Sequence, residues 1–582
     1  MAAVGRFKED AVASSAPDPV VPTDAEAPTS WKPLALQGLL VAALALTLNL
    51  AGNGRISLWD RDEPRYATCV REMIARADWV FPTYNAEPRY HKPVLTYWLM
   101  RGAYAIAGDN TFGARLVSAI AGAGTCLLTW WFGRRLLGPK AGLLAGLILA
   151  TAPIMVAESK LSTTDATLTF FLVGSWIALW ELGRKASTVW ALVFWTSLAL
   201  ATLTKGPVGP GLIAISLVAS WWWGGPTAWR GRLRWKLGLP LFLAITAPWY
   251  VAIGFLSHGD FYRVAMGYHV VRRMTTGLEE HGGFPGYYLA STLLTFHPWS
   301  ALLPAAAYGA WSRRKVDPKF GFLLGWVVGP LILLEAVRTK LLHYYLPAYP
   351  ACSLLAAWLI VAVAHEGVNL RRWPLGRLSL GLLAGVGLGG AIGLIAAIWF
   401  VPSALAWPCG VVGMLMAAGT IFALDRYQRA FTDRATQGLI ATWGVVLLLT
   451  GAWLLPAAEP LRMSRLVGDR LRSLAVANSA TPVMFSFQEP GVVYALGRPA
   501  PPMRGRPQLI AQLQRSGAVI AATLPEEERI LRADPRFVVE VRDSLRGFNM
   551  TKGKTQTLNF VLIRASGSDA FAARPVQQPL VK

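Results

Sequence analysis

The segment Leu34–Ala51 reads LALQGLLVAALALTLNLA, and a few residues later Trp59–Tyr66 reads WDRDEPRY. The first stretch carries no charge and approaches the roughly 20 apolar residues that a helix needs to cross a bilayer. In the second stretch, five of the eight residues are charged. Asp60, Asp62 and Glu63 therefore stand beside a predicted membrane span, where an anionic patch has no lipid partner and costs desolvation. This juxtaposition predicts a membrane protein and raises the question of what three carboxylates do at its edge.

The composition of the whole chain favours a membrane protein with many spans. Of its 582 residues, 54% are hydrophobic and 15% are charged, whereas about a quarter of the residues are charged in a soluble domain. We expect thirteen spans, which begin near residues 33, 115, 141, 166, 188, 207, 237, 287, 320, 342, 378, 404 and 437. The net charge of +23 would suggest nucleic acid in a soluble protein, but here Lys and Arg cluster between apolar runs. Membrane lipids are therefore the expected partners, and nucleic acid is not.

The basic clusters between the predicted spans indicate the orientation of the chain. They are Arg134–Arg135–Lys140, Arg184–Lys185, Arg230–Arg232–Arg234–Lys236, Arg313–Arg314–Lys315, Arg371–Arg372–Arg377 and Arg426–Arg429. Each lies between an even-numbered span and the next odd-numbered one, on the side of the N-terminus. The positive-inside rule makes that side cytoplasmic. Because the span number is odd, we expect the C-terminal region on the opposite, extracytoplasmic side.

Three regions are predicted along the chain. Residues 1–32 are rich in Ala, Pro, Ser and Asp and are expected to form a disordered cytoplasmic tail. Residues 33–458 form the transmembrane domain, with a long first extracytoplasmic loop at 52–111. In residues 459–582, short apolar pieces such as TPVMFSF and LNFVLIRA alternate with helical patterns such as RPQLIAQLQRSG. This alternation predicts a small soluble α/β domain outside the cytoplasm.

Titratable residues gather on the predicted outer face. They include Lys92, Lys160, Lys205, Arg272, Arg273, Lys340 and six of the seven histidines, among them His91 and His269. A solvated turn is the simpler explanation for Asp60, Asp62 and Glu63, and a helix cap is the simpler one for Asp165. Taken together on one face, however, these groups indicate an acid–base or metal-bearing cavity.

Two sequence patterns imitate nucleotide sites. The run GVGLGG at 385–390 fits G-x-G-x-x-G, but it lies inside an apolar span without a preceding strand, so it is interpreted as helix-packing glycine. Asp60–Arg61–Asp62 resembles a D-x-D motif, yet no nucleotide fold surrounds it.

No Walker motif is visible, so no nucleotide cofactor is expected and an enzyme here must draw its energy from its substrate. A polyprenyl phosphate sugar fits, because its phosphate is both leaving group and membrane anchor. Transfer then needs a base near the acceptor and cations around the departing phosphate.

Several motifs resemble those of a known family. The chain carries DEPRYA at 62–67, REMI and DWVFP within 71–82, KPVLTYW at 92–98, TTDATL at 163–168 and KLLHYYLPAYP at 340–350. Together they resemble the aminoarabinose lipid A transferases, which are GT-C membrane glycosyltransferases related more distantly to the protein O-mannosyltransferases. The resemblance covers about residues 33–455, and its first and third motifs are the most specific.

The resemblance implies both a fold and an activity. The fold is an α-helical polytopic GT-C-like membrane protein, with about 13 transmembrane helices and a small C-terminal extracytoplasmic α/β domain. The location is the inner membrane of a bacterium, with the C-terminal domain periplasmic. The activity is inverting transfer of a sugar from a polyprenyl phosphate donor to a lipid A-like lipid, a glycan or another envelope acceptor.

The resemblance also implies roles for individual residues. Asp62 matches the family's catalytic carboxylate, with Glu63 beside it, and Asp165 matches a second acid with a supporting role. The residues implied at the donor phosphate are Lys92, Tyr66, Arg272, Arg273, Tyr345 and Lys340. His269 matches a histidine near a metal, and His91 replaces the acid that usually precedes the family's lysine. The His91–His269 pair either holds a zinc-like divalent ion, for which imidazole is a good ligand, or no metal binds.

Two alternative functions are weighed. A protein O-mannosyltransferase-like enzyme would keep the chemistry and change the acceptor, but Lys92–Pro93 stands where that family usually has His–Pro–Pro. A transporter of lipid-linked substrates would need charged residues within the spans, whereas here they gather at one mouth. Both are less favoured than the lipid-directed transferase.

Overall fold

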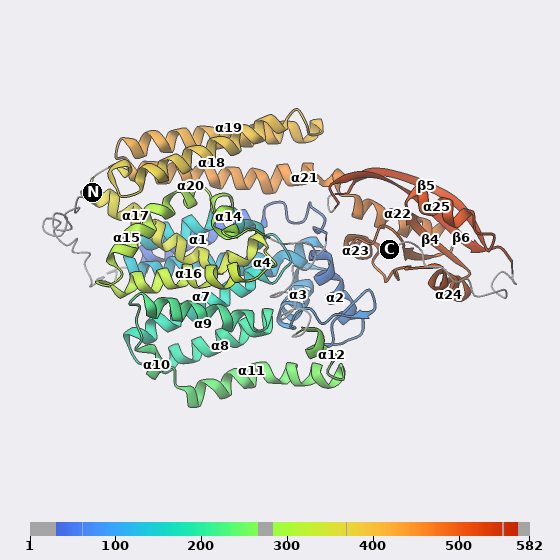
Figure 1. The fold of residues 1–582 in the computed structure, drawn as a ribbon, viewed down its shortest axis with the longest axis horizontal. Coiled ribbons are helices and arrows are strands. Elements are labelled where there is room, and N and C mark those ends of the chain that lie inside the picture. Colours follow the sequence, from blue (N-terminus) through green and yellow to red (C-terminus); the bar gives the residue numbers. More distant parts are fainter. Residues whose placement is uncertain (1–30, 61, 266–282, 368, 550–551, 568–582) are drawn as a thin grey trace, which may run out of the picture.

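The computed structural model describes residues 31–60, 62–265, 283–367, 369–549 and 552–567. Figure 1 shows a bundle of long helices, with a separate domain built around a β-sheet at one end of it. Helices α2 and α3, from the first loop, lie at the same end of the bundle as the sheet domain. The predicted fold class, a polytopic helical protein with a small C-terminal α/β domain, is therefore confirmed.

Ten helices in the described part of the chain are long and apolar enough to cross a membrane. They contain α1 (Trp31–Leu50), α4 (Thr111–Leu137), α7 (Asp165–Arg184), α8 (Thr188–Lys205), α11 (Trp235–Leu256), α16 (Pro318–Ala336), α17 (Tyr349–Glu366), α18 (Gly376–Ala397), α19 (Ser403–Gln428) and α20 (Thr432–Leu449). Each corresponds to one of the thirteen predicted spans. The chain is thus a multi-pass membrane protein.

The three remaining predicted spans are broken or short. The span predicted near 141 is a pair, α5 (Pro139–Ala150) and α6 (Pro153–Ser159), bent by 61°. The span near 207 is α9 (Val208–Trp222), with 15 residues. The span near 287 is divided into α14 (Tyr287–Thr295), the 3₁₀ helix η3 (Trp299–Leu302) and α15 (Leu303–Arg313). A proline lies at each interruption, at Pro153, Pro207 and Pro298, where the missing N–H removes a helical hydrogen bond.

Shorter helical elements connect the spans. They are α10 (Trp229–Arg232), α12 (Asp260–Tyr262), η4 (Leu342–Ala348), η5 (Leu370–Arg372), the π-helical turn η6 (Thr450–Leu454), α21 (Leu455–Ala457) and η7 (Glu459–Leu461). The predicted domain boundary at 458/459 falls between α21 and η7. Most of the predicted tail, residues 1–30, lies outside the described residues.

The bundle core is held by close helix packing and stacked aromatic rings. The rings of Trp176 and Trp326 stack with centroids 5.1 Å apart, and Phe322 packs edge-on against Trp176. A Cβ added to Gly325 of α16 would come within 2.4 Å of the backbone nitrogen of Ser220 in α9. Such small residues let backbones approach closely, which drives helix association in a membrane.

The first outer loop folds as two helices joined by a short hairpin. The helices are α2 (Glu63–Ala75) and α3 (Leu95–Ala107), and between them β1 (Thr83–Tyr84) pairs antiparallel with β2 (Glu87–Pro88). The buried faces of both helices form one apolar cluster with Trp249 and Ile253 of α11. The loop that the sequence predicted as long is thus largely helical.

The C-terminal domain is a four-stranded mixed sheet flanked by short helices. Its elements are α22 (Met463–Ala477), β3 (Thr481–Met484), α23 (Pro490–Leu496), α24 (Arg506–Ser516), β4 (Ala518–Thr523), α25 (Pro525–Arg532), β5 (Phe537–Asn549) and β6 (Lys554–Ala565). The strand order is β3-β4-β6-β5, with β3 parallel to β4 and the other pairs antiparallel. In the register Val519 faces Ile563, and a bulge interrupts β5 at Val541/Asp543.

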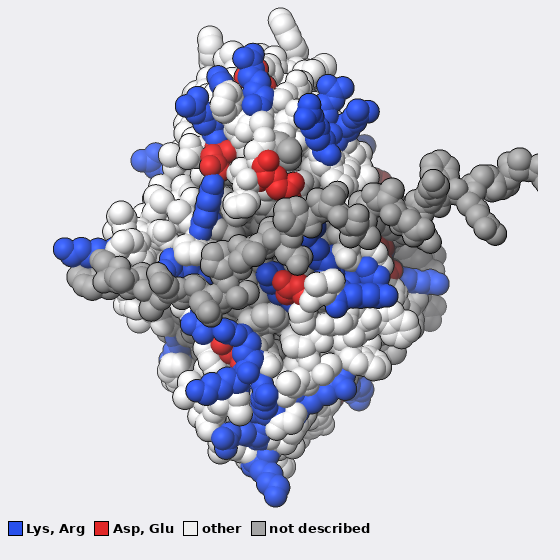
Figure 2. Space-filling model, turned by 90° about the vertical axis from the view of Figure 1, so that its left-hand side faces the viewer, with Lys and Arg blue, Asp and Glu red and all other residues white. Residues whose placement is uncertain are grey.

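The opposite end of the bundle is basic. Figure 2 looks onto this end and shows blue Lys and Arg side chains spread over much of it, with few red acidic ones. Arg134 and Arg135 lie in the last turn of α4, and Arg184 lies in the last turn of α7. The sequence grouped these basic residues on one side of the predicted spans, and they stand at the ends of α4 and α7.

Candidate active site

Glu63 of WDRDEPRY is a buried ion-pair partner. Arg115 of α4 donates from Nε to Oε1 at 2.9 Å and from Nη2 to Oε2 at 2.7 Å, and both side chains are at most 2% exposed. The backbone N–H groups of Trp59 and Ser162 also donate to Glu63. The carboxylate thus ties the outer loop to α4 and to the link that precedes α7. Its contacts are those of a residue that positions the loop, and its predicted catalytic role stays a prediction.

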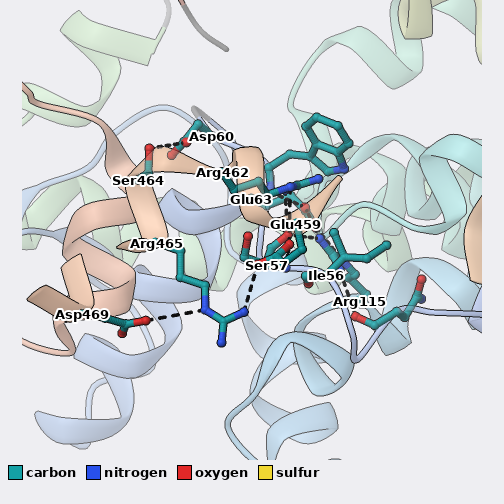
Figure 3. A network of polar contacts seen from close by, with 12 residues as sticks. Ile56, Ser57, Asp60, Glu63, Arg115, Glu459, Arg462, Ser464, Arg465 and Asp469 are labelled. Atoms are coloured by element: carbon teal, nitrogen blue, oxygen red, sulfur yellow. Dashed lines mark hydrogen bonds and ion pairs between the residues drawn. The ribbon is translucent and has the colours of Figure 1, made fainter. Parts of the chain in front are cut away.

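Asp60 fastens the C-terminal domain to the loop. Its Oδ2 accepts from the Ser464 hydroxyl at 2.5 Å (Figure 3), and its Oδ1 accepts from the Gly491 N–H at 2.8 Å. A Cβ on Gly491 would lie 2.4 Å from Asp60 Oδ1, so glycine is required for this approach. Burial is the dominant influence on Asp60 and raises the pKa of its carboxyl above the ordinary value.

Asp62 is the most open of the three acids. Its side chain is 59% exposed, and among described residues its one ion pair is with Arg65, at 3.9 Å. It stands just before the first residue of α2, where its side chain makes no capping hydrogen bond. Of the three carboxylates, Asp62 is the one whose oxygens are available to accept a proton from another molecule.

A cavity of about 520 Å³ lies beside this loop. Its polar lining comes from Tyr90, His91, Lys92, Asp165, Lys205 and Tyr344. Its apolar walls come from residues such as Leu212 of α9, Leu333 and Leu334 of α16, and Phe261 of α12. The cavity therefore joins a charged end to an apolar wall, which suits a ligand with an anionic head and a hydrocarbon tail.

The charged end is built around Asp165, the first residue of α7. Lys205, the last residue of α8, places Nζ 2.5 Å from Asp165 Oδ1. His343 lies 3.9 Å from Asp165 Oδ2 through Nε2, and 3.6 Å from Glu158 Oε1 through Nδ1. The ring of Tyr344 lies 4.7 Å from the Lys205 ammonium. This network holds two carboxylates and a cation in place at the mouth of the membrane domain.

Lys92 enters the same cavity from the outer loop. It follows β2 and precedes Pro93, which lies two residues before α3 begins. His91 lines the cavity beside it. The structure thus brings Lys92 and Asp165, 73 positions apart in the sequence, into one cavity with Lys205.

Tyr66 lies behind the cavity, among buried aromatic residues. Its ring is 5.7 Å from that of Tyr97, and the guanidinium of the buried Arg89 lies 5.2 Å from it. Burial is the largest influence on Tyr66 and raises the pKa of its phenol, so the group stays protonated at neutral pH. These contacts support the segment that carries His91 and Lys92.

Other predicted residues lie elsewhere or outside the described residues. The Tyr345 hydroxyl donates to the Val327 carbonyl at 2.8 Å, and Lys340 pairs with Glu335 at 2.6 Å. Neither Tyr345 nor Lys340 lines the cavity. His269, Arg272 and Arg273 belong to residues 266–282, outside the described part of the chain. Their roles stay predictions.

The metal prediction finds no support in the described ranges. Within them, no group of three or more His, Cys, Asp or Glu side chains is arranged to hold an ion. His91 alone supplies one imidazole, and its predicted partner His269 is outside those ranges. No chemical step is therefore assigned to a metal.

The prediction assigned no role to Lys205, Tyr344, His343 and Glu158, although all four surround Asp165. The only signal available was their placement at predicted span ends on the outer face. Tyr344 is adjacent to the predicted Tyr345, and the tight turns of η4 (Leu342–Ala348) decide which of the two faces the cavity.

The chain is similar in sequence to known membrane transferases. The family described as dolichyl-phosphate-mannose-protein mannosyltransferase matches residues 91–251. The undecaprenyl phosphate-alpha-4-amino-4-deoxy-L-arabinose arabinosyl transferase of Pseudomonas paraeruginosa is 29% identical over 457 residues, which are 75% of this chain and 78% of that protein. The transferase of the same name from Pseudomonas aeruginosa strain LESB58 is 29% identical over 440 residues, covering 72% and 75%.

The fold comparison points the same way. The crystal structure of ArnT from Cupriavidus metallidurans bound to undecaprenyl phosphate matches with a TM-score of 0.72, at 22% identity, and covers 94% of this chain and all of that one. The match shows that the two chains share a fold. The resemblance drawn from the sequence motifs is confirmed.

Proposed function

We propose that this chain, a membrane glycosyltransferase homologous to the undecaprenyl phosphate-aminoarabinose arabinosyl transferases, moves a sugar from a polyprenyl phosphate donor to a lipid A-like envelope acceptor. By analogy with these relatives, the first donor to consider is undecaprenyl phosphate linked to 4-amino-4-deoxy-L-arabinose. The observation that carries the proposal is the cavity in which Lys92, Lys205 and Asp165 meet an apolar wall.

The two ends of the cavity suit the two ends of such a donor. The isoprenoid chain is apolar and gains by leaving water for the wall formed by α9 and α16. The phosphate is anionic and gains from an ammonium in a water-poor site, where charge–charge attraction is stronger than in bulk water. Lys92 lines the cavity together with Lys205, and Lys92, the lysine that the family resemblance implies at the donor phosphate, is the cation proposed to contact it.

The proposed reaction is a single displacement at the anomeric carbon. The acceptor oxygen forms a bond to that carbon, and the bond to the phosphate oxygen breaks on the opposite side, which inverts the configuration. Asp62 takes the acceptor proton or orients the acceptor, a role open to its exposed carboxylate. The polyprenyl phosphate leaves with the bonding electrons, and Lys92 stabilises the charge that develops on it.

The orientation in the membrane is part of the proposal. The basic end of the bundle (Figure 2) would face the cytoplasm under the positive-inside rule. The sheet domain and the cavity mouth would then lie on the extracytoplasmic, periplasmic side of a bacterial inner membrane. Labelling of single cysteines placed near residues 134 and 515 with an impermeant reagent on intact cells tests this arrangement.

A divalent ion near His91 stays a prediction with its own test. If His91 and His269 hold a zinc-like ion, purified wild-type protein contains about one equivalent of it. His91→Ala would then lose that equivalent in elemental analysis. Equal metal content in the two proteins would remove the ion from consideration.

The decisive experiment supplies purified protein in liposomes with polyprenyl phosphate sugars and separate acceptors. The donors are undecaprenyl phosphate carrying aminoarabinose or a hexose, and the acceptors are lipid A and a Ser/Thr-rich peptide. We expect mass spectrometry to detect the sugar on the lipid and not on the peptide. Transfer to the peptide would favour the protein O-mannosyltransferase-like alternative, which the family match at 91–251 keeps under test. Absence of transfer from every donor would refute the proposal.

A further inference from the structure

A second cavity, of about 280 Å³, lies where the C-terminal domain meets the first outer loop. Its lining contains five arginines, Arg55, Arg71, Arg462, Arg465 and Arg472, and two acids, Asp60 and Asp469. Two arginines come from the outer loop and three come from α22 or the residue before it. The cavity thus exists only because the two parts of the chain are docked.

The two acids in the lining do not balance the five arginines, although Arg71 also pairs with Asp109 and Arg465 with Glu459, which lie outside the lining. The two Asp60 oxygens accept one hydrogen bond each, from Ser464 and from Gly491. Asp469 pairs with Arg465 at 3.6 Å (Figure 3). Within the described ranges, Arg55 and Arg472 form no ion pair. The cavity therefore keeps an excess of positive charge.

Arg462 is the buried centre of this excess. Its side chain is 5% exposed, and its guanidinium lies 3.7 Å from the ring of Trp59. One nitrogen, Nη1, donates to the Ser57 carbonyl at 2.8 Å. Nε and Nη2 find no hydrogen-bond acceptor among the described residues, and the nearest carboxylate oxygen, on Glu459, is 3.6 Å from Nε. Leaving a buried charged donor without an acceptor is costly, so its persistence indicates a missing anionic ligand.

The chemistry of the missing ligand follows from the donors. A guanidinium presents its N–H groups in a planar fork that matches the oxygens of a phosphate. The volume admits a phosphate group and little more, since ligand pockets usually exceed about 300 Å³. The apolar side chains that also line it, Ile56 and Leu58, fit the neutral part of a headgroup.

We propose that this arginine-lined junction cavity is a phosphate-binding site that holds a phosphate group of the lipid acceptor. The inference rests on the proposed function for the identity of the lipid, while phosphate binding itself does not depend on it. The loop residues Arg55 to Asp60 that border the cavity continue directly into Asp62, the proposed base. A phosphate bound here anchors the acceptor at a fixed distance from that carboxylate.

The first test measures phosphate binding alone. Inorganic phosphate is titrated into the purified full-length protein in detergent, without donor or acceptor, and binding is followed by calorimetry. We expect Arg462→Gln to weaken binding about tenfold or more, as for a lost charged hydrogen bond, and Arg55→Ala to weaken it about two- to fivefold. Arg515→Ala, an exposed arginine on α24 outside the cavity, is the matched control and leaves binding unchanged.

The second test separates a lipid headgroup from free phosphate. Transfer is measured with matched lipid acceptors that carry two phosphate groups or one. We expect Arg55→Ala to raise the KM for the doubly phosphorylated lipid about two- to fivefold, with kcat and the KM for the other lipid unchanged. Because Arg55 is exposed and unpaired within the described ranges, this variant avoids the folding risk of Arg462→Gln.

The outcomes distinguish this site from the proposed function. Phosphate binding that is equal in wild type and both arginine variants, or absent from wild type, overturns the site even if transfer proceeds. A second outcome is that Arg55→Ala weakens phosphate binding but does not raise the KM for the doubly phosphorylated lipid relative to the other lipid. This outcome overturns the acceptor assignment and leaves a site for free phosphate. Absence of transfer with normal phosphate binding refutes the proposed function but not the site.

Discussion

The two cavities carry similar charge in opposite settings. In the membrane cavity, Lys92 and Lys205 face an apolar wall, and the acid between them is buried and shared with Lys205 and His343. In the junction cavity, five arginines line a pocket between the outer loop and the C-terminal domain, and of its two acids Asp60 contacts that domain while Asp469 pairs with Arg465 of the same helix. A lysine is a compact point charge, whereas arginine offers a fork of donors that holds an oxyanion in one orientation. The difference fits the two proposals, a departing phosphate in the first cavity and a stationary one in the second.

Between the two cavities stands the segment WDRDEPRY, whose three acids do three different things. Asp60 holds the C-terminal domain, Glu63 holds α4, and Asp62 is left exposed. Two of the acids therefore have structural roles, and Asp62 is left for the proposed chemical one. The predictions below test this division.

The largest effect is expected from Asp62. Asp62→Asn keeps the size of the side chain and removes its basicity, so kcat should fall about 10²- to 10⁴-fold, the range for a lost general base. Because the side chain is exposed, the melting temperature should stay the same. Steady-state transfer assays and a thermal melt measure both quantities. Activity within twofold of wild type would show that Asp62 is not the base.

Breaking the Asp165–Lys205 pair should act on stability as well as activity. Asp165→Asn leaves Lys205 buried without its 2.5 Å partner, and losing one side of a buried pair costs about 3–5 kcal/mol. The double variant Asp165→Asn, Lys205→Met removes both charges and should recover much of that stability. Denaturation in detergent checks this recovery. If the double variant lost as much stability as Asp165→Asn and Lys205→Met lose together, the two charges would not be coupled.

Lys92 should affect transfer with little effect on folding. Lys92→Ala removes the cation proposed at the donor phosphate and should lower kcat about 10²- to 10³-fold, as for a lost donor at a developing charge. Lys92→Arg keeps the charge and should retain more activity than Lys92→Ala. Lys140→Ala, at an exposed ion pair with Asp433, is the control. Equal activity of Lys92→Ala and Lys140→Ala would contradict the assignment.

The sequence predicted the fold from local signals and the site from motif spacing. Hydropathy alone identified all ten long spans, because a membrane helix must be apolar over its own length. Prolines divided the other three, and the consequence of a proline for a helix that is packed in a bundle depends on its neighbours. Lys92 and Asp165 were correctly expected on one face, and the structure places them in one cavity.

What the sequence could not supply were contacts between distant segments. Ser464 lies 404 positions from Asp60, and Arg115 lies 52 positions from Glu63. No local pattern distinguishes an acid that docks a domain from one that is free to react. Two adjacent tyrosines, Tyr344 and Tyr345, differ only in which way a 3₁₀ turn directs them.

The smallest effect is expected from Asp60, and it concerns pH. Asparagine can replace both contacts of Asp60, so Asp60→Asn should change stability at neutral pH by less than about 1 kcal/mol.

Burial raises the pKa of the Asp60 carboxyl above its ordinary value of 3.8. The folded protein then binds this proton more tightly than the unfolded chain does. The stability that the group contributes is therefore fully present below pH 3.8, its ordinary pKa, and is lost as the pH rises through the pKa of the folded protein. The melting temperature of Asp60→Asn should therefore rise relative to that of wild type as the pH rises above the ordinary value of 3.8 toward neutrality. Arg515→Ala, which removes no carboxyl group, is the control and should show no such trend, and a trend of equal size in both variants would mean that the burial of Asp60 is not its cause.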